Sequence, residues 1–105
     1  MKCDVILSKA GMRDIDRMSD EIFDVSLDKN TAIEYVDKML EKINNLAYFP
    51  ESGTPLYFDN RLTKYRFIVY KSYMAFYRIT DNTIIIDRIL FGRSDYHKEL
   101  LSGDN

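Results

Sequence analysis

Five residue types capable of acid–base or phosphate chemistry fall together in the run Arg-Ser-Asp-Tyr-His-Lys near the end of the chain. Cleavage of RNA by a neighbouring 2′-hydroxyl needs a general base, a general acid and cations beside the crowded phosphate. His97 or Asp95 is the candidate base, and Tyr96 or His97 is the candidate acid. Arg93, together with Arg66 from an upstream segment, would supply the cations.

The same run also fits a purely structural role. Asp95 would cap a short terminal helix, Tyr96 would pack on the preceding sheet, and Leu100 and Leu101 would seal the sheet edge. A segment that follows a rigid strand is also a common place for functional side chains. Both interpretations stay open from the residues alone.

Other charged side chains are candidates for contact with a partner. These partner-binding candidates are Lys71, Arg78, Arg88 and Asp95. The chain also has eight tyrosines among 105 residues, several of them beside these cations, where they could stack nucleic-acid bases. Tyrosines of a small sheet more often fill the core and keep the hydroxyl in water, and we favour that interpretation.

Several classes of chemistry find no support in the composition. There is no glycine-rich phosphate loop, and a single histidine and a single cysteine do not make the usual zinc sites, so we expect neither metal nor cofactor. Cys3 is interpreted as a small core residue of a first strand. No long apolar run suggests a signal peptide or a membrane span, which makes the cytoplasm the expected location.

The net charge of −2 is unevenly distributed. Residues 1–60 carry 7 Lys/Arg and 12 Asp/Glu, a balance of −5, whereas residues 61–101 carry 8 Lys/Arg and 4 Asp/Glu, a balance of +4; Asp104 adds the remaining −1. A basic half can meet an acidic protein or a phosphate backbone. A mixed solvated surface accounts for the same numbers.

The elements that must position these residues begin with a strand over residues 2–7 and a helix from the N-cap Ser8 to about residue 27. The expected buried face of this helix consists of Met12, Ile15, Met18 and Ile22, at helical spacing. The expected polar face consists of Arg13, Asp14, Asp16, Arg17, Asp20 and Glu21.

A second helix is expected after cap and turn residues 28–31, where Thr31 and Glu34 fit a capping box. The short connection makes the two helices an antiparallel pair. Pro50 ends the helical region. Residues 51–55 are expected to form a loop, and the spacing leaves the conformation of residues 56–62 open.

Three strands follow, over residues 65–70, 73–79 and 83–92, joined by tight turns at 71–72 and 81–82. The predicted fold class is α+β: an N-terminal strand, an αα-hairpin and a three-stranded antiparallel meander. We expect one domain over residues 1–101 with a short tail at 102–105.

Two-residue turns fix the expected strand pairing. The predicted pairs are Tyr70 with Tyr73, Arg66 with Tyr77, and Ala75 with Arg88. Arg66, Tyr77 and Arg88 would then share one face, with Phe67, Val69, Met74, Phe76, Ile85 and Ile89 on the other. A one-residue bulge would reverse part of this assignment.

Taken in order, these features resemble the RelE/ParE superfamily of toxins from bacterial type II toxin–antitoxin systems, over about residues 3–101. In the helices the resemblance rests on Ser8 with Asp14-Ile15, on Ala32, and on Ile43, Leu46, Phe49-Pro50 and Gly53. In the strands it rests on Arg66-Phe67-Ile68-Val69, on Tyr73 with Tyr77-Arg78-Ile79, and on Ile84, Ile86, Arg88-Ile89-Leu90, Gly92-Arg93 and Asp95.

The resemblance implies a small cytoplasmic toxin of the plasmid-stabilisation type, neutralised in a hetero-oligomer with a cognate antitoxin. RelE-like members cut mRNA on the ribosome, and ParE-like members poison DNA gyrase. Met74 stands where RelE-like members place an arginine, so the resemblance leans towards the gyrase inhibitors. An mRNA endoribonuclease is the alternative, and an interaction module without toxicity is a further one.

Overall fold

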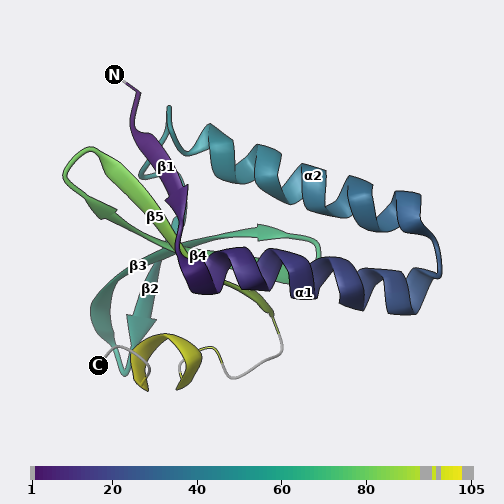
Figure 1. The fold of residues 1–105 in the computed structure, drawn as a ribbon. Helices are drawn as coiled ribbons and strands as arrows, with labels where there is room; N and C mark the ends of the chain where they lie inside the picture. Colours follow the sequence, from purple (N-terminus) through teal and green to yellow (C-terminus); the bar gives the residue numbers. More distant parts are fainter. Residues whose placement is uncertain (1, 93–95, 97, 103–105) are drawn as a thin grey trace.

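The computed structural model describes residues 2–92, 96 and 98–102 of the chain. Its elements follow one another in a simple order (Figure 1). They are β1 (Asp4–Leu7), α1 (Lys9–Ser26), α2 (Lys29–Asn45), β2 (Thr54–Phe58), β3 (Arg61–Tyr70), β4 (Tyr73–Thr80), β5 (Thr83–Phe91) and the short helix η1 (Lys98–Ser102). No helix in this part of the chain is long and apolar enough to cross a membrane.

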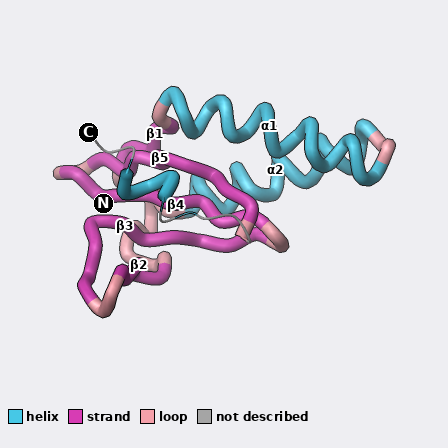
Figure 2. The backbone as a smooth tube through the Cα atoms, turned by 90° about the horizontal axis from the view of Figure 1, so that it is seen from below, coloured by secondary structure: helices cyan, strands magenta, loops and turns pink. Residues whose placement is uncertain are grey.

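The strands form one sheet in the order β1-β5-β4-β3-β2, in which β1 runs parallel to β5 and all other neighbours are antiparallel. The α1–α2 hairpin lies along one face, and its tip projects beyond the strands (Figures 1 and 2). The predicted α+β class is confirmed. The meander has four strands rather than three, so that with β1 the sheet has five.

The additional strand is β2. The sequence predicts a loop over residues 51–55 and leaves the conformation of residues 56–62 open. It pairs with the first part of β3 across a turn at Asp59 and Asn60, whose φ angles are 51° and 62°. Asp and Asn tolerate this left-handed conformation, which two-residue hairpin turns require. Pro55 is accommodated because β2 is an edge strand, where a missing N–H breaks no ladder.

The predicted pairing of β4 holds as far as Tyr77 and then shifts by one residue. Tyr70 pairs with Tyr73 and Arg66 with Tyr77, as expected, but Ala75 pairs with Ile89 instead of Arg88. The extra residue of this bulge is Asp87, which follows the Tyr77–Ile86 pair. The predicted faces of Arg88 and Ile89 are therefore wrong: Ile89 packs under the helices, and Arg88 lies opposite Phe76.

Helix α1 starts where expected, but its buried face is rotated from the predicted one. Met18, Ile15 and Ile22 pack inward as predicted, whereas Met12 is exposed. Asp14, assigned to the solvated face, is only 2% exposed. The spacing of apolar residues cannot reveal this, because the buried face carries an acid whose partners come from β5.

Helix α2 begins earlier than the predicted capping box at Thr31. Asp28 is its N-cap: its Oδ1 accepts from the Asn30 N–H at 3.1 Å, and its Oδ2 accepts from the Thr31 hydroxyl at 2.9 Å. A shorter link between the helices follows, with Leu27 in the left-handed region at φ 55°. The hairpin is therefore tightly closed.

The core has two layers, one on each face of the sheet. Between helices and sheet lie fully buried side chains that each contribute about 1.5–3 kcal/mol through burial. They include Met18, Met39, Ile43, Tyr77, Ile84, Ile86 and Ile89. On the other face Leu56, Tyr65, Phe76, Leu90 and Leu100 form a smaller cluster, which places η1 across that face.

Candidate functional site

The N-terminus of α1 is fixed tightly against β5. The Ser8 N–H donates to the Ile86 carbonyl at 3.0 Å, and the Ser8 Oγ accepts from the Gly11 N–H while donating to the Asp87 carbonyl, both at 2.9 Å. A Cβ on Gly11 would lie 2.7 Å from the Ile86 carbonyl oxygen. The helix can approach the strand this closely only because residue 11 has no side chain.

Asp14 projects from this end of α1 into a fully satisfied polar cluster. Its Oδ2 accepts from the Arg88 Nε at 2.7 Å and from the Ile89 backbone N–H at 2.8 Å. Its Oδ1 accepts from the Arg17 Nη1 at 2.6 Å and the Arg88 Nη2 at 3.1 Å. A buried carboxylate is tolerated when it is paired and hydrogen-bonded in this way.

Arg88 links this cluster to the C-terminal helix. Its Nη1 lies 2.9 Å from the Glu99 Oε2 of η1, opposite the side that holds Asp14. The hydrogen bonds to Asp14 are the main cause that raises the pKa of Arg88, with Glu99 adding to them. Arg88 therefore joins α1, β5 and η1 as a permanently charged clamp.

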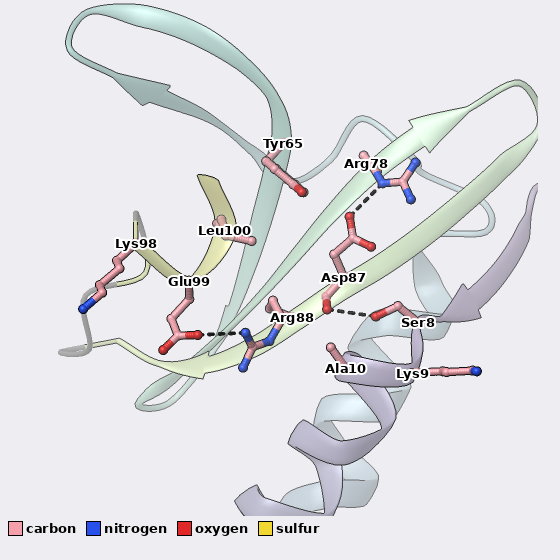
Figure 3. Close-up of a pocket in the computed structure, with 10 residues that line it drawn as sticks. All are labelled: Ser8, Lys9, Ala10, Tyr65, Arg78, Asp87, Arg88, Lys98, Glu99 and Leu100. Atoms are coloured by element: carbon pink, nitrogen blue, oxygen red, sulfur yellow. Dashed lines mark hydrogen bonds and ion pairs between the residues drawn. The ribbon is translucent and has the colours of Figure 1, made fainter. Parts of the chain in front are cut away.

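An open cleft of about 570 Å³ lies beside this clamp, between the start of α1, β5 and η1 (Figure 3). Its walls are formed by Ser8, Lys9, Ala10, Tyr65, Arg78, Asp87, Arg88, Lys98, Glu99 and Leu100. The lining carries four cationic and two acidic side chains. Figure 3 shows Lys9 and Lys98 on opposite sides of the cleft.

The arginines of the cleft are engaged by acids. Arg78 Nε donates to Asp87 Oδ2 at 2.7 Å, and Arg88 is held as described above. Such paired cations still attract an anionic surface at short range, because the lining as a whole has more positive than negative side chains. Across residues 2–92, 96 and 98–102, no group of three or more His, Cys, Asp or Glu side chains is placed to hold a metal.

Arg66, predicted as a catalytic cation, lies away from this cleft and holds a loop. Its Nη1 donates to the carbonyls of Glu51 at 3.1 Å and Gly53 at 2.9 Å. The buried Tyr77 hydroxyl donates to the Pro50 carbonyl at 2.7 Å and accepts from the Gly53 N–H at 3.0 Å. Burial raises the pKa of Tyr77, with the bond from Gly53 opposing this effect.

The remaining predicted residues are scattered. Tyr96 stacks on Phe76 with ring centroids 5.1 Å apart, so its ring packs on the sheet. Lys71 lies in the β3–β4 turn over the rings of Tyr35 and Tyr70. The other candidates from the C-terminal run, Arg93, Asp95 and His97, lie outside the described residues.

In the structure, the predicted residues Arg78 and Arg88 line one cleft together with residues of η1. Arg66 and Lys71 lie elsewhere. Sequence reasoning missed Asp14, Asp87 and Glu99 as partners of the two cleft arginines. The only signal for Asp14 was its place in the helical motif Asp14-Ile15. Nothing in the spacing links it to Arg88, which is 74 positions away.

Two solved structures from toxin–antitoxin systems share the fold of this chain. One is the chromosomal ParDE system from P. aeruginosa, with a TM-score of 0.71 at 17% identity over 86% of this chain and 96% of that chain. The other is the RelBE2 toxin–antitoxin complex from Mycobacterium tuberculosis, with 0.62 at 19% over 87% and 99%.

The family model of the ParE toxin of the type II toxin–antitoxin system parDE matches residues 5–96. The chain belongs to this ParE toxin family. No curated protein sequence matches the chain significantly.

Proposed function

We propose that this ParE-family toxin acts by binding DNA gyrase, and that a cognate antitoxin neutralises it. The proposal rests on the observation that two candidate cations, Arg66 and Arg88, are already bound by acceptors within the protein. Arg66 is bound to two loop carbonyls, and Arg88 is bound to Asp14 and Glu99. Cations held by internal acceptors suit a rigid binding surface better than a site that must receive a scissile phosphate.

Met74 adds support from the sheet. It packs in the apolar cluster with Phe76 and Tyr96. The resemblance to RelE-like members implies an arginine at this position in the nucleases. An apolar side chain there contributes to packing and offers no charge to a transition state. Function in this proposal is the recognition of a protein surface, which needs shape and charge but no catalytic group.

A second candidate, cleavage of mRNA on the ribosome, draws on the cleft. Lys9, Arg78, Arg88 and Lys98 line one hollow next to Tyr65, and cations beside an aromatic ring suit single-stranded RNA. A loss of cleavage on changing the exposed Lys9 would support this candidate. The matched control is Lys29, an exposed lysine at the start of α2.

The test uses the purified chain on both targets. Supercoiling of relaxed plasmid by gyrase and the integrity of mRNA on translating ribosomes are measured with wild type, Lys9→Gln and Lys29→Gln. We expect supercoiling to be inhibited by all three proteins and mRNA to stay intact. Cleaved mRNA that depends on Lys9 but not on Lys29 would replace this proposal with the nuclease. If neither target is affected, a binding module without toxicity remains.

A further inference from the structure

The two edge strands of the sheet differ in how they are protected against pairing with another chain. These strands are β2 and β1 (Figure 2). In β2, Pro55 lacks an N–H, and the register with β3 shifts between Pro55 and Tyr57. Both features hinder the addition of a further strand. In β1, the apolar residues Val5, Ile6 and Leu7 follow one another without a proline, a charge or a register shift.

The backbone of β1 carries unpaired hydrogen-bonding groups along its outer edge. The N–H groups of Asp4 and Ser8 donate to carbonyls of β5 and of the turn before it, each over 3.0 Å. Because N–H groups alternate between the two sides of a strand, those of Cys3, Val5 and Leu7 point away from β5. The Cys3 N–H donates to a carbonyl just after α2 at 2.8 Å. Among the described residues, no acceptor is found for the N–H groups of Val5 and Leu7.

The space beside this edge is open. A hollow of about 430 Å³ lies between the first half of β1 and the end of α2. Val5 and Leu7 direct their side chains to the core under the helices, so Ile6 lies on the other face, where it is 50% exposed. An added strand would find both unpaired backbone groups and an apolar side chain to cover.

We propose that β1 pairs with β1 of a second copy of this chain, antiparallel, about a two-fold axis at Ile6. Val5 of each copy then pairs with Leu7 of the partner subunit. Each such pair exchanges two hydrogen bonds, so the two pairs use the unpaired N–H groups of both copies. Isologous pairing of this kind closes into a dimer, whereas the protected β2 edge disfavours a head-to-tail chain. The inference does not depend on which target the toxin acts upon.

The structure also selects this register over its neighbours. An axis at Val5 would place Leu7 of the partner subunit against Cys3, where Ala47 already accepts a hydrogen bond. An axis at Leu7 would place Val5 against the start of α1, where the partner chain is no longer extended. Only the axis at Ile6 pairs extended residues with one another. It also brings the two Ile6 side chains into contact across a non-hydrogen-bonded pair.

The charges at the ends of the paired strands are complementary in this register. Asp4 lies opposite Ser8 of the partner subunit and next to the partner's Lys9, and both Asp4 and Lys9 are exposed. The two-fold axis creates this contact twice. Lys2, the other cation at this end, lies over the Tyr48 ring, 5.7 Å from its centroid. Opposite charges that meet in this way favour a second copy as the occupant of the edge.

The test follows sedimentation of the full chain from about 5 to about 500 µM. The proposed contact uses only part of a four-residue strand, so we expect a monomer at the lowest concentration and a dimer at the highest. A monomer throughout this range would leave the edge to a strand of another protein and would overturn the proposal.

Hydrogen exchange of the backbone amides locates the contact. The amides of Val5 and Leu7 should exchange at least about tenfold more slowly in the dimer than in the dilute monomer, because each gains a hydrogen bond. A dimer that leaves both exchange rates unchanged would use another surface, which would overturn the proposal.

A matched pair of substitutions tests the contact at the axis. Ile6→Lys places two like charges opposite each other and should weaken the dimer by at least about tenfold. Ile33→Lys is the control, because Ile33 on α2 is exposed to a similar extent, 48% against 50% for Ile6. It should leave dimerisation within about twofold of wild type. An equal effect of the two substitutions would mean non-specific repulsion and would overturn the proposal.

A charge exchange tests the register. Asp4→Lys should weaken the dimer by about fivefold, and adding Lys9→Asp to the same chain should restore it to within about twofold of wild type. Circular dichroism shows whether each variant is folded. A folded double variant that dimerises as weakly as Asp4→Lys would contradict the register and overturn the proposal.

Discussion

The two ends of α1 meet the rest of the molecule in opposite ways. At the start, Gly11 and Asp14 bring the helix against β5 through close contact and charge-assisted hydrogen bonds. At the other end, Val25 and Leu27 are exposed on a tip that projects past the sheet (Figures 1 and 2). The start of α1 is held closely against the sheet, whereas its other end leaves apolar and acidic side chains exposed to solvent.

This difference separates the part of α1 that stabilises the fold from the part that a partner can contact. Near the start of α1 the charge of Asp14 is buried and paired, so altering it disrupts the fold. At the tip the charge of Asp24 is exposed, so altering it changes the surface that a partner meets. Substitutions in matched pairs, one at each end, can therefore test whether the two ends of α1 differ in this way.

The largest effect is expected from Asp14→Asn. Removing the carboxylate charge leaves the guanidinium of Arg88 without its main partner and should lower the free energy of unfolding by about 3 kcal/mol. Asp24→Asn, the same change at the exposed end, should alter it by less than about 0.5 kcal/mol. Urea unfolding followed by circular dichroism measures both. Equal effects at the two positions would remove the contrast.

Gly11→Ala should be the next most damaging. Alanine in a helix normally stabilises by about 1 kcal/mol over glycine, but here the new Cβ would meet the Ile86 carbonyl oxygen. The helix would have to move from β5, and we expect a loss of about 2 kcal/mol instead. The sign of the change in unfolding free energy decides the matter, since a gain would mean that α1 is free to shift.

Tyr73→Phe tests the contact between the second half of α1 and the sheet. Loss of the hydrogen bond to Glu21 should cost about 1 kcal/mol near pH 8. Burial first, and then that hydrogen bond, raises the pKa of Tyr73 above its ordinary value of 10.0. Above pH 10 the unfolded chain therefore binds fewer protons than the folded one, and stability falls as the pH rises, whereas below pH 10 this contribution is fully present.

The variant should accordingly show a shallower loss of stability between pH 10 and 11 than wild type. Tyr57→Phe, at an exposed position of β2, serves as the control and should reproduce the wild-type slope. Unfolding midpoints at several alkaline pH values provide the comparison. Identical slopes for Tyr73→Phe and wild type would mean that another group is responsible.

The smallest expected change is a gain from Leu27→Gly. Leu27 is the C-cap of α1 at φ 55°, a conformation that glycine adopts without strain, and its side chain is 78% exposed. We expect about 0.5 kcal/mol of added stability, visible as a higher urea midpoint. A loss of stability would show that its side chain packs at the tip.

The sequence was sufficient for the parts of the fold that local rules determine. Ser8 and the apolar spacing located α1, and the two-residue turns fixed the pairing of β3 with β4. A one-residue bulge was allowed for, but no local signal placed it at Asp87. Strand β2 was missed although Asp59-Asn60 carried a turn signal, since Pro55 and mixed polarity obscured the alternation.

The candidate site was harder to predict than the fold. In the sequence, the residue types suited to catalysis are concentrated near the C-terminus. In the structure, the cleft is lined by residues that include parts of α1, β5 and η1. Arg88 and Arg78 were named, yet their roles depend on Asp14 and Asp87, which no spacing connects to them. Long-range ion pairs of this kind are properties of the folded chain.

The most direct test of the proposed action follows DNA and protein synthesis in bacteria within minutes of inducing this chain, using labelled thymidine and methionine. We expect thymidine incorporation to fall first while translation continues, as inhibition of gyrase requires. An immediate fall in methionine incorporation, with mRNA cut within codons, would contradict the account and assign the toxin to the ribosome.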